Sequence, residues 1–377
     1  MTSTPRTGLV AAAVLLALGS AQAQDRHTQI GTYTAADYAR MAPMTGNNPA
    51  DDTPSVQDWR VTPGMSFNGV NFDGNVRLRF DSDGSLSNGG FVCSGTLLMG
   101  GQFVITAAHC ADDFAAPGFV MEISSGIYGN VAATTQSIQG SNVYVHPGWT
   151  GALGDGSDIA VIRLGTPITN ATGFNLSTTN DVGQTLLIMG HGTTQLGNVA
   201  SATNWNDYGW AHYAYNVADV TDKAFADAWD GSGDNTHGEG YVFDFDGLVD
   251  PARHNTLQRV ADLRGNPFSS NQGLGMPEGI TAGGDSGGGD FVWNGSEWLL
   301  TGVHSWGWQF CGGRITTPTN CDFSSANGSS WGDISGSTAV FSHVAWITGI
   351  TGPVPEPGTY ALMALGLLAV GAAARRR

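Results

Sequence analysis

The chain has 377 residues, enough for one large or two ordinary domains, and a formal net charge of −17 at pH 7. Such a negative net charge argues against nucleic acid as a partner, because a phosphate backbone requires a basic face. With 55 glycines and only 12% charged residues, the composition favours a β-rich fold with many turns over a helical one. An acidic surface also suits a secreted protein.

Residues 1–23 predict a secretory signal peptide. Arg6 supplies a positive start, Leu9 to Leu18 is apolar, and Ala21-Gln22-Ala23 is a small-x-small cleavage site. The apolar run is shorter than the roughly 20 residues of a membrane span. Export would place the four cysteines in an oxidising compartment as candidates for two disulfides, Cys93, Cys110, Cys311 and Cys321.

A polar, irregular stretch over residues 24–60 predicts a pro-segment or linker. From about Val61 the pattern changes. Val76 to Phe80 alternates like a half-buried strand, and a hairpin is expected over residues 95–107. We therefore expect the folded domain to occupy residues 61–352.

A histidine and a cysteine follow this hairpin directly, as His109 and Cys110. A histidine held at a strand end can act as a general base, and Cys110 can pin that turn to Cys93. Closing the loop of 17 positions (110 − 93) would stabilise the fold by roughly 3 kcal/mol. The competing interpretation is a surface histidine beside a free thiol.

Asp158 opens an almost wholly apolar strand that runs from Ile159 to Leu164. A carboxylate at the mouth of a buried strand is costly unless it is paired. The N–H group of a histidine is the obvious partner. The alternative is an ordinary strand-capping aspartate.

Glycines surround Asp285 and Ser286 over residues 283–289. A serine on a sharp glycine turn exposes its hydroxyl. Neighbouring N–H groups can then converge on the oxyanion that forms when this hydroxyl attacks. Alone, the string also fits a plain turn. Together with His109 and Asp158 it predicts a nucleophile, a base and a buried acid.

The C-terminus carries Val354-Pro355-Glu356-Pro357, an apolar run from Tyr360 to Ala374 and three final arginines. Such a stretch is held in a membrane with its charges on the cytoplasmic side, so a bare anchor is one interpretation. Residues 353–377 closely resemble the PEP-CTERM sorting signal of Gram-negative bacteria. The resemblance implies transient anchoring in the inner membrane, removal of the tail by an exosortase, and delivery to the cell surface, the extracellular matrix or the medium.

Seven motifs between Val61 and Thr351 together resemble the trypsin-like (chymotrypsin-fold) serine peptidases. In chain order they are Cys93 to Leu98, Thr106 to Cys110, His146-Pro147, Asp158 to Ala160, Gly190 to Thr193, Gly284 to Gly288 and Ser305 to Gly307. The resemblance implies an all-β fold of two six-stranded antiparallel β-barrels with a short C-terminal helix. It also implies hydrolysis of proteins or peptides through an acyl-enzyme.

In that family Ser286 would be the nucleophile, His109 the general base and Asp158 the residue that orients the imidazole. The N–H groups of Gly284 and Ser286 would form the oxyanion hole. No metal or organic cofactor is expected for this chemistry.

The resemblance also implies a specificity pocket. Its floor would be Ile280, six positions before the nucleophile (286 − 6), and its walls Gly307 and Ala339. An uncharged floor with small walls predicts cleavage after apolar residues of medium size. Cys311 and Cys321 are expected to close their own loop just beyond Gly307.

Activation by cleavage is a further expectation from the resemblance. The cut would fall between Arg60 and Val61, and the new amino group would pair with Asp285, ordering the oxyanion hole. Val61-Thr62-Pro63-Gly64 departs from the family's usual Ile-Val-Gly-Gly.

Asp158 and Ser286 are 128 positions apart (286 − 158), which predicts an insertion at about residues 204–271. Within it, residues 243–247 with Asp250 fit either a calcium loop or a solvated turn. Two other functions stay open for the whole chain. One is a catalytically idle binding protein of the surface or matrix, and the other is a hydrolase of esters.

Overall fold

The computed structural model describes residues 28–29, 45–46, 56–81, 84–87, 90–129, 131–199, 205, 207–229, 238–248, 250–308 and 329–352. The predicted signal peptide, the sorting tail, Cys311 and Cys321 lie outside these residues. No helix among the described residues is both long and apolar enough to cross a bilayer.

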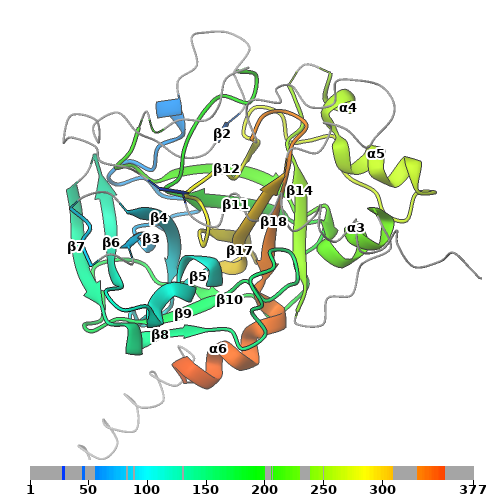
Figure 1. Ribbon diagram of the computed structural model, residues 1–377. Coiled ribbons are helices and arrows are strands. Elements are labelled where there is room, and N and C mark those ends of the chain that lie inside the picture. The colour runs from blue at the N-terminus through cyan, green and yellow to red at the C-terminus, as the bar shows by residue number, and fades with distance from the viewer. Residues whose placement is uncertain are drawn as a thin grey trace, which may run out of the picture.

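The first sheet has eight strands, in the order β7-β6-β3-β4-β5-β9-β8 with β1 paired to β4 (Figure 1). Its strands are β1 (Thr28–Gln29), β3 (Asn75–Asp81), β4 (Phe91–Leu97), β5 (Phe103–Thr106), β6 (Val120–Tyr128), β7 (Val131–Ile138), β8 (Val143–Val145) and β9 (Ala160–Arg163). Outer strand β7 alternates between exposed and half-buried residues, as expected for a strand with one wet face.

The second sheet also has eight strands, in the order β12-β11-β16-β17-β18-β14-β13 with β10 paired to β17. They are β10 (Asn175–Leu176), β11 (Thr185–Gly190), β12 (His212–Val217), β13 (Val220–Thr221), β14 (Gly240–Asp244), β16 (Gly289–Trp293), β17 (Trp298–Trp308) and β18 (Ile334–Ala339). A separate two-stranded sheet joins β2 (Thr45–Gly46) to β15 (Gly279–Ile280).

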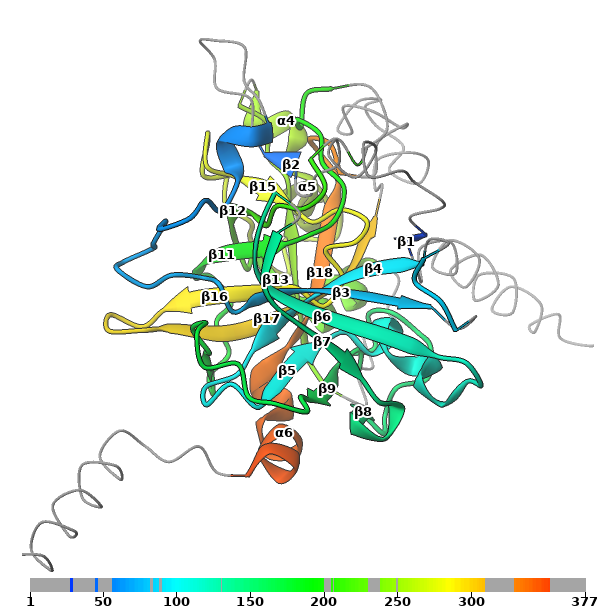
Figure 2. The ribbon, with the colours of Figure 1, turned by 90° about the vertical axis from the view of Figure 1, so that its left-hand side faces the viewer.

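The helices are short. The 3₁₀ turns are η1 (Val56–Trp59), η2 (Ala108–Cys110), η3 (Asp112–Ala115), η4 (Gly140–Asn142) and η5 (Val340–His343), and the α-helices are α3 (Asp222–Trp229), α4 (Pro251–His254), α5 (Thr256–Leu263) and α6 (Val344–Thr351). Figure 2 shows α6 at one end of the molecule and the β2–β15 pair at the other.

The all-β expectation with a short C-terminal helix is confirmed, since the two sheets are curled antiparallel half-barrels and α6 ends the described chain. Each sheet exceeds the six expected strands by two short ones, β1 and β8 in the first and β10 and β13 in the second. The main apolar core joins both sheets. Val104 and Ile162 of the first sheet belong to the same buried cluster as Leu187 and Phe291 of the second.

Two expected boundaries look different in the structure. The stretch 24–60 supplies β1, which pairs with β4, and β2, which pairs with β15, so parts of it join the fold. Within the expected insertion 204–271, strands β12, β13 and β14 belong to the second sheet. The added elements are α3, α4 and α5, which Figure 1 shows grouped beyond β14.

Candidate active site

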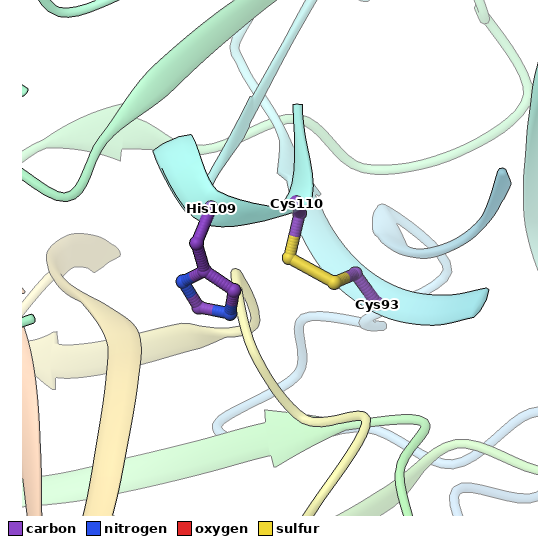
Figure 3. A group of neighbouring side chains, drawn as sticks. All are labelled: Cys93, His109 and Cys110. Atoms are coloured by element: carbon purple, nitrogen blue, oxygen red, sulfur yellow. A yellow bond between two sulfur atoms is a disulfide. The ribbon is translucent and has the colours of Figure 1, made fainter. Parts of the chain in front are cut away.

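His109 lies in η2, immediately after β5, and its side chain is 1% exposed. The turn is fixed by the disulfide between Cys93 of β4 and Cys110, whose Cα atoms are 6.2 Å apart, and this predicted bond is confirmed (Figure 3). Thr106 Oγ1 also donates to the Ser94 carbonyl at 2.7 Å. The histidine is therefore anchored through its chain neighbours on both sides.

Figure 3 also shows how close the imidazole lies to the two sulfur atoms. In the described part of the chain, Cys93, His109 and Cys110 are the one trio of Cys, His, Asp or Glu side chains with ligand atoms within 4.8 Å of one another. Because both sulfurs are bonded in the disulfide, neither is a thiolate that could bind a metal. The trio is a structural anchor rather than a metal centre.

Asp158 is fully buried and precedes β9, as its position before the apolar strand predicted. Its carboxylate accepts hydrogen bonds from His109 Nδ1 at 2.7 Å, from the His109 main-chain N–H at 2.9 Å and from Ser305 Oγ at 2.5 Å. A carboxylate only accepts, so the imidazole proton lies on Nδ1 and Nε2 is left with a lone pair. This is the tautomer of a general base.

Ser305 reaches Asp158 because β17 has a bulge. The register of β17 with β18 shifts between His304 and Trp306, which leaves Ser305 as the extra residue. A bulge re-aims the side chain at that position. Thr338 of β18 adds a hydrogen bond to the Asp158 carbonyl at 3.1 Å. Asp158 and His109 both lie next to strands of the first sheet, and two residues of the second sheet hydrogen-bond to Asp158.

Ser286 lies on a turn between the two sheets. Its carbonyl accepts from Ser94 N at 2.7 Å and lies 3.6 Å from Cys110 Sγ, which puts it beside the segment that carries His109. No hydrogen bond joins the Ser286 hydroxyl to His109 among the contacts of the described residues. Gly287 has φ +80°, and a Cβ there would lie 2.0 Å from Thr106 Oγ1, so only glycine permits this approach.

Two main-chain N–H groups at this turn have no protein acceptor. Among the hydrogen bonds of the described residues, neither Gly284 N nor Ser286 N donates, whereas the N–H groups of Asp285, Gly287 and Gly288 all do. A buried N–H without a partner is uncommon in native proteins. Two such groups, one of them the N–H of the serine itself, can receive an oxyanion.

A second buried histidine–aspartate pair supports the same turn. His304 Nε2 lies 2.8 Å from Asp290 Oδ1, and its main chain bonds to both Gly287 N and the Gly288 carbonyl. Burial lowers the pKa of His304, but the Asp290 carboxylate outweighs it, and the net direction is upward. This pair was not found from the sequence because both residues sit inside strands that read as apolar.

Asp285, the expected partner of a new N-terminus, is fully buried. Its carboxylate accepts from Gly192 N at 2.8 Å and from Ala282 N at 2.9 Å. In the uncut chain Val61 N donates to the Ala211 carbonyl at 2.8 Å, and Arg60 forms an ion pair with Asp207.

The expected pocket residues do not all meet. Ile280 is fully buried in β15, and Gly307 is exposed in β17. Strand register places Gly307 opposite Ser335, whereas Ala339 lies opposite Gly302 and is fully buried in the core. Register therefore separates Ala339 from Gly307 and pairs Gly307 with Ser335, whose hydroxyl accepts from Thr281 Oγ1 at 2.8 Å.

Comparison with known families agrees with this geometry. The family model described as Trypsin matches residues 74–219. The chain carries a trypsin-family domain. The matched segment includes His109 and Asp158 and ends before Ser286.

A second family model, the PEP-CTERM protein-sorting motif, matches residues 353–377. This motif indicates an exported protein that is sorted to the cell surface after processing by an exosortase. A search of the curated proteins found no match for the trypsin-family chain.

Proposed function

We propose that the trypsin-family domain is an active serine endopeptidase with Ser286, His109 and Asp158 as its catalytic residues. The observation that carries this is the buried His109–Asp158 pair, with its 2.7 Å hydrogen bond, beside a glycine turn that presents Ser286 and two N–H groups without acceptors. Chains that lose activity in such a family usually lose one of these side chains.

In this proposal each group has one step. Nε2 of His109 takes the proton of the Ser286 hydroxyl as its oxygen attacks the scissile carbonyl. The N–H groups of Gly284 and Ser286 hold the oxyanion, a contribution of roughly 3 kcal/mol per donor in such enzymes. His109 then protonates the leaving amine, and water releases the acyl group by the same route. Asp158 stabilises the imidazolium throughout.

Covalent labelling tests the nucleophile. A fluorophosphonate should add one label per chain, located at Ser286 by peptide mass, and Ser286→Ala should take up none. Ser305→Ala is the matched control, since it removes a neighbouring hydroxyl but keeps the nucleophile, and it should still be labelled. A folded parent chain without label would favour the idle binding protein over the enzyme.

Activation by cleavage after Arg60 is part of the proposal. Labelling should then be confined to a chain that begins at Val61 and absent from one that begins at Gln24. The alternative is an oxyanion hole ordered without a new N-terminus, because each oxygen of Asp285 already accepts a main-chain hydrogen bond. Equal labelling of both chains would discard activation and keep the enzyme.

Specificity for an apolar residue before the scissile bond rests on Ile280. An uncharged, buried floor offers no counter-ion for Arg or Lys, while Gly307 leaves the entrance open and Ser335 adds only a small hydroxyl. We expect kcat/KM for a Leu or Val peptide to exceed that for the matching Arg peptide at least tenfold, measured with chromogenic substrates. A preference for Arg would contradict the assignment of the floor. Ester substrates of the same series separate a peptidase from an esterase.

The sorting tail sets where this activity acts. We propose that the hydrophobic segment 360–374 anchors the exported chain transiently in the inner membrane, and that tail removal delivers the peptidase to the cell surface, the matrix or the medium. Its substrates are then proteins or peptides outside the cell.

A further inference from the structure

Four acidic side chains gather where β14 meets α5 and the segment before β15. Figure 1 shows α5 beyond β14. The four acids are Asp219 between β12 and β13, Asp244 at the end of β14, Asp246 just after it, and Glu278 just before β15. Each is at most 7% exposed. The solvated turn considered for residues 243–247 is therefore wrong, because these acids are inside the protein.

Main-chain and side-chain donors orient three of the carboxylates. Asp219 Oδ1 accepts from Ser270 Oγ and from the main-chain and side-chain N–H groups of Asn271, at 2.7–3.1 Å. Asp244 Oδ2 accepts from Leu257 N at 2.8 Å. The two oxygens of Glu278 accept from Asp246 N at 2.7 Å and Leu274 N at 2.6 Å.

The second oxygens of two of these groups have no partner. Asp219 Oδ2 and Asp244 Oδ1 are buried and accept no hydrogen bond. Buried polar atoms are almost always satisfied, and a buried charge needs a counter-charge. None of Asp219, Asp244 and Glu278 forms an ion pair with a basic side chain in the described part of the chain.

Burial of these carboxyl groups, together with repulsion between them, raises their pKa values. Burial, followed by repulsion from Asp219, raises the pKa of Asp244 well above its usual range. Burial and then Asp244 raise the pKa of Asp246 to about 11, and burial raises that of Glu278 to about 8. The Asp219 carboxylate is buried too but lies by the main-chain N–H of Asp244, and its pKa is raised to about 6. Asp219 lies beside β14, since its main-chain N–H donates to the Val242 carbonyl, two positions before Asp244, at 3.1 Å.

We propose that this acidic cluster is a binding site for a divalent cation, Ca²⁺, with the free oxygens of Asp219 and Asp244 as its inner ligands. The donors are all oxygens, which favours a hard cation over zinc or copper. The carboxylates come from separate segments, with Asp244 at the end of β14 and the other three outside the strands, which suits the flexible coordination of Ca²⁺ better than the strict octahedron of Mg²⁺.

The spacing of the carboxylates limits the inner ligand set. Among the described residues, no three acids of the cluster have oxygens within 4.8 Å of one another. Ca²⁺ takes 6–8 oxygens, so main-chain carbonyls and water must complete the shell. Asp246 and Glu278 then act mainly through their charge.

The cation would link parts of the chain that are distant in sequence. Asp244 ends a strand of the second sheet, while the donors to Asp219 come from residues 270–271 of the added segment. Glu278 lies eight positions before Ser286 (286 − 278) and two before Ile280 (280 − 278). Binding would therefore stabilise the segment that leads to the pocket floor and the catalytic turn.

Calcium binding by the full chain with Ser286→Ala, which prevents self-digestion, tests the proposal. After dialysis against CaCl₂ and removal of free ion, atomic emission should find one Ca²⁺ per chain. Calorimetry should show an unfolding midpoint higher by roughly 5 °C when Ca²⁺ is about 100 times its Kd, relative to chain treated with EGTA. MgCl₂ should give a smaller shift at equal concentration.

Two variants locate the site. Asp244→Asn keeps an acceptor for Leu257 N but removes a charge, so it should weaken Ca²⁺ binding at least tenfold and leave the calcium-free midpoint equal or higher. Asp227→Asn is the control: it changes an exposed aspartate of α3 that pairs with Lys223, and its Ca²⁺ affinity should match the parent's. A folded parent that binds no Ca²⁺ at millimolar concentration would overturn the proposal. So would Asp244→Asn binding as tightly as the parent, or Asp227→Asn losing the ion.

Discussion

Asp158→Asn should lower kcat about 10⁴-fold with little change in KM; the magnitude is taken over from the same change in trypsin. Asp158 accepts three hydrogen bonds, two of them from His109. An asparagine has a single acceptor oxygen, and its NH₂ group would donate to Nδ1. The imidazole proton would then move to Nε2, and the general base would be lost although every heavy atom keeps its place.

Steady-state hydrolysis of one chromogenic peptide measures this effect, with Asp262→Asn as the control. Asp262 is an exposed aspartate of α5 far from the catalytic turn in sequence, and its variant should keep parental kinetics. Ser305→Ala removes one donor to Asp158 and should cost much less, on the order of tenfold. An Asp158→Asn chain that keeps more than a tenth of the parental kcat would show that Asp158 does not set the tautomer of His109.

Removal of the Cys93–Cys110 disulfide should lower the free energy of unfolding by roughly 3 kcal/mol, on the chain-entropy account of a 17-residue loop. Both cysteines are buried, so Cys93→Ala with Cys110→Ala keeps the site apolar. The variant should also lose activity, because η2 positions His109 and Cys110 Sγ touches the Ser286 carbonyl.

Urea unfolding of the double variant, in a Ser286→Ala background, measures the loss of stability. The slope of the free energy with urea should equal or exceed the parent's, since an unfolded chain without the cross-link can expose more surface. Met99→Ala, at an exposed site in the turn between β4 and β5, serves as the control and should change stability by less than about 0.5 kcal/mol. A loss below about 1 kcal/mol would mean that packing alone holds η2 in place.

The sequence alone determined the family and the Cys93–Cys110 disulfide, and it supplied the proposed catalytic residues. His109, Asp158 and Ser286 each sit in a short motif whose neighbours have a local physical role: a strand end, an apolar strand and a glycine turn. Local roles of this kind depend on few distant contacts. The sorting motif at residues 353–377 is equally local, because it consists of adjacent residues read in order.

Tertiary structure alone decided which residue lies opposite Gly307 and which histidine pairs with Asp290. Ser335 faces Gly307 only because β17 carries a bulge at Ser305, and a shift of one residue changes every cross-strand partner beyond it. His304 and Asp290 meet across paired strands, and no pattern within either strand reports that.

The acidic cluster shows the same limit most clearly. Phe243-Asp244-Phe245-Asp246 alternates, and alternation predicts that the aspartates face water. That inference holds only for a sheet with one solvated face. Here α5 and the segment before β15 cover the second face, so both aspartates are buried. Alternation in sequence separates the two faces of a strand, but only the packing of distant elements decides whether a face meets water.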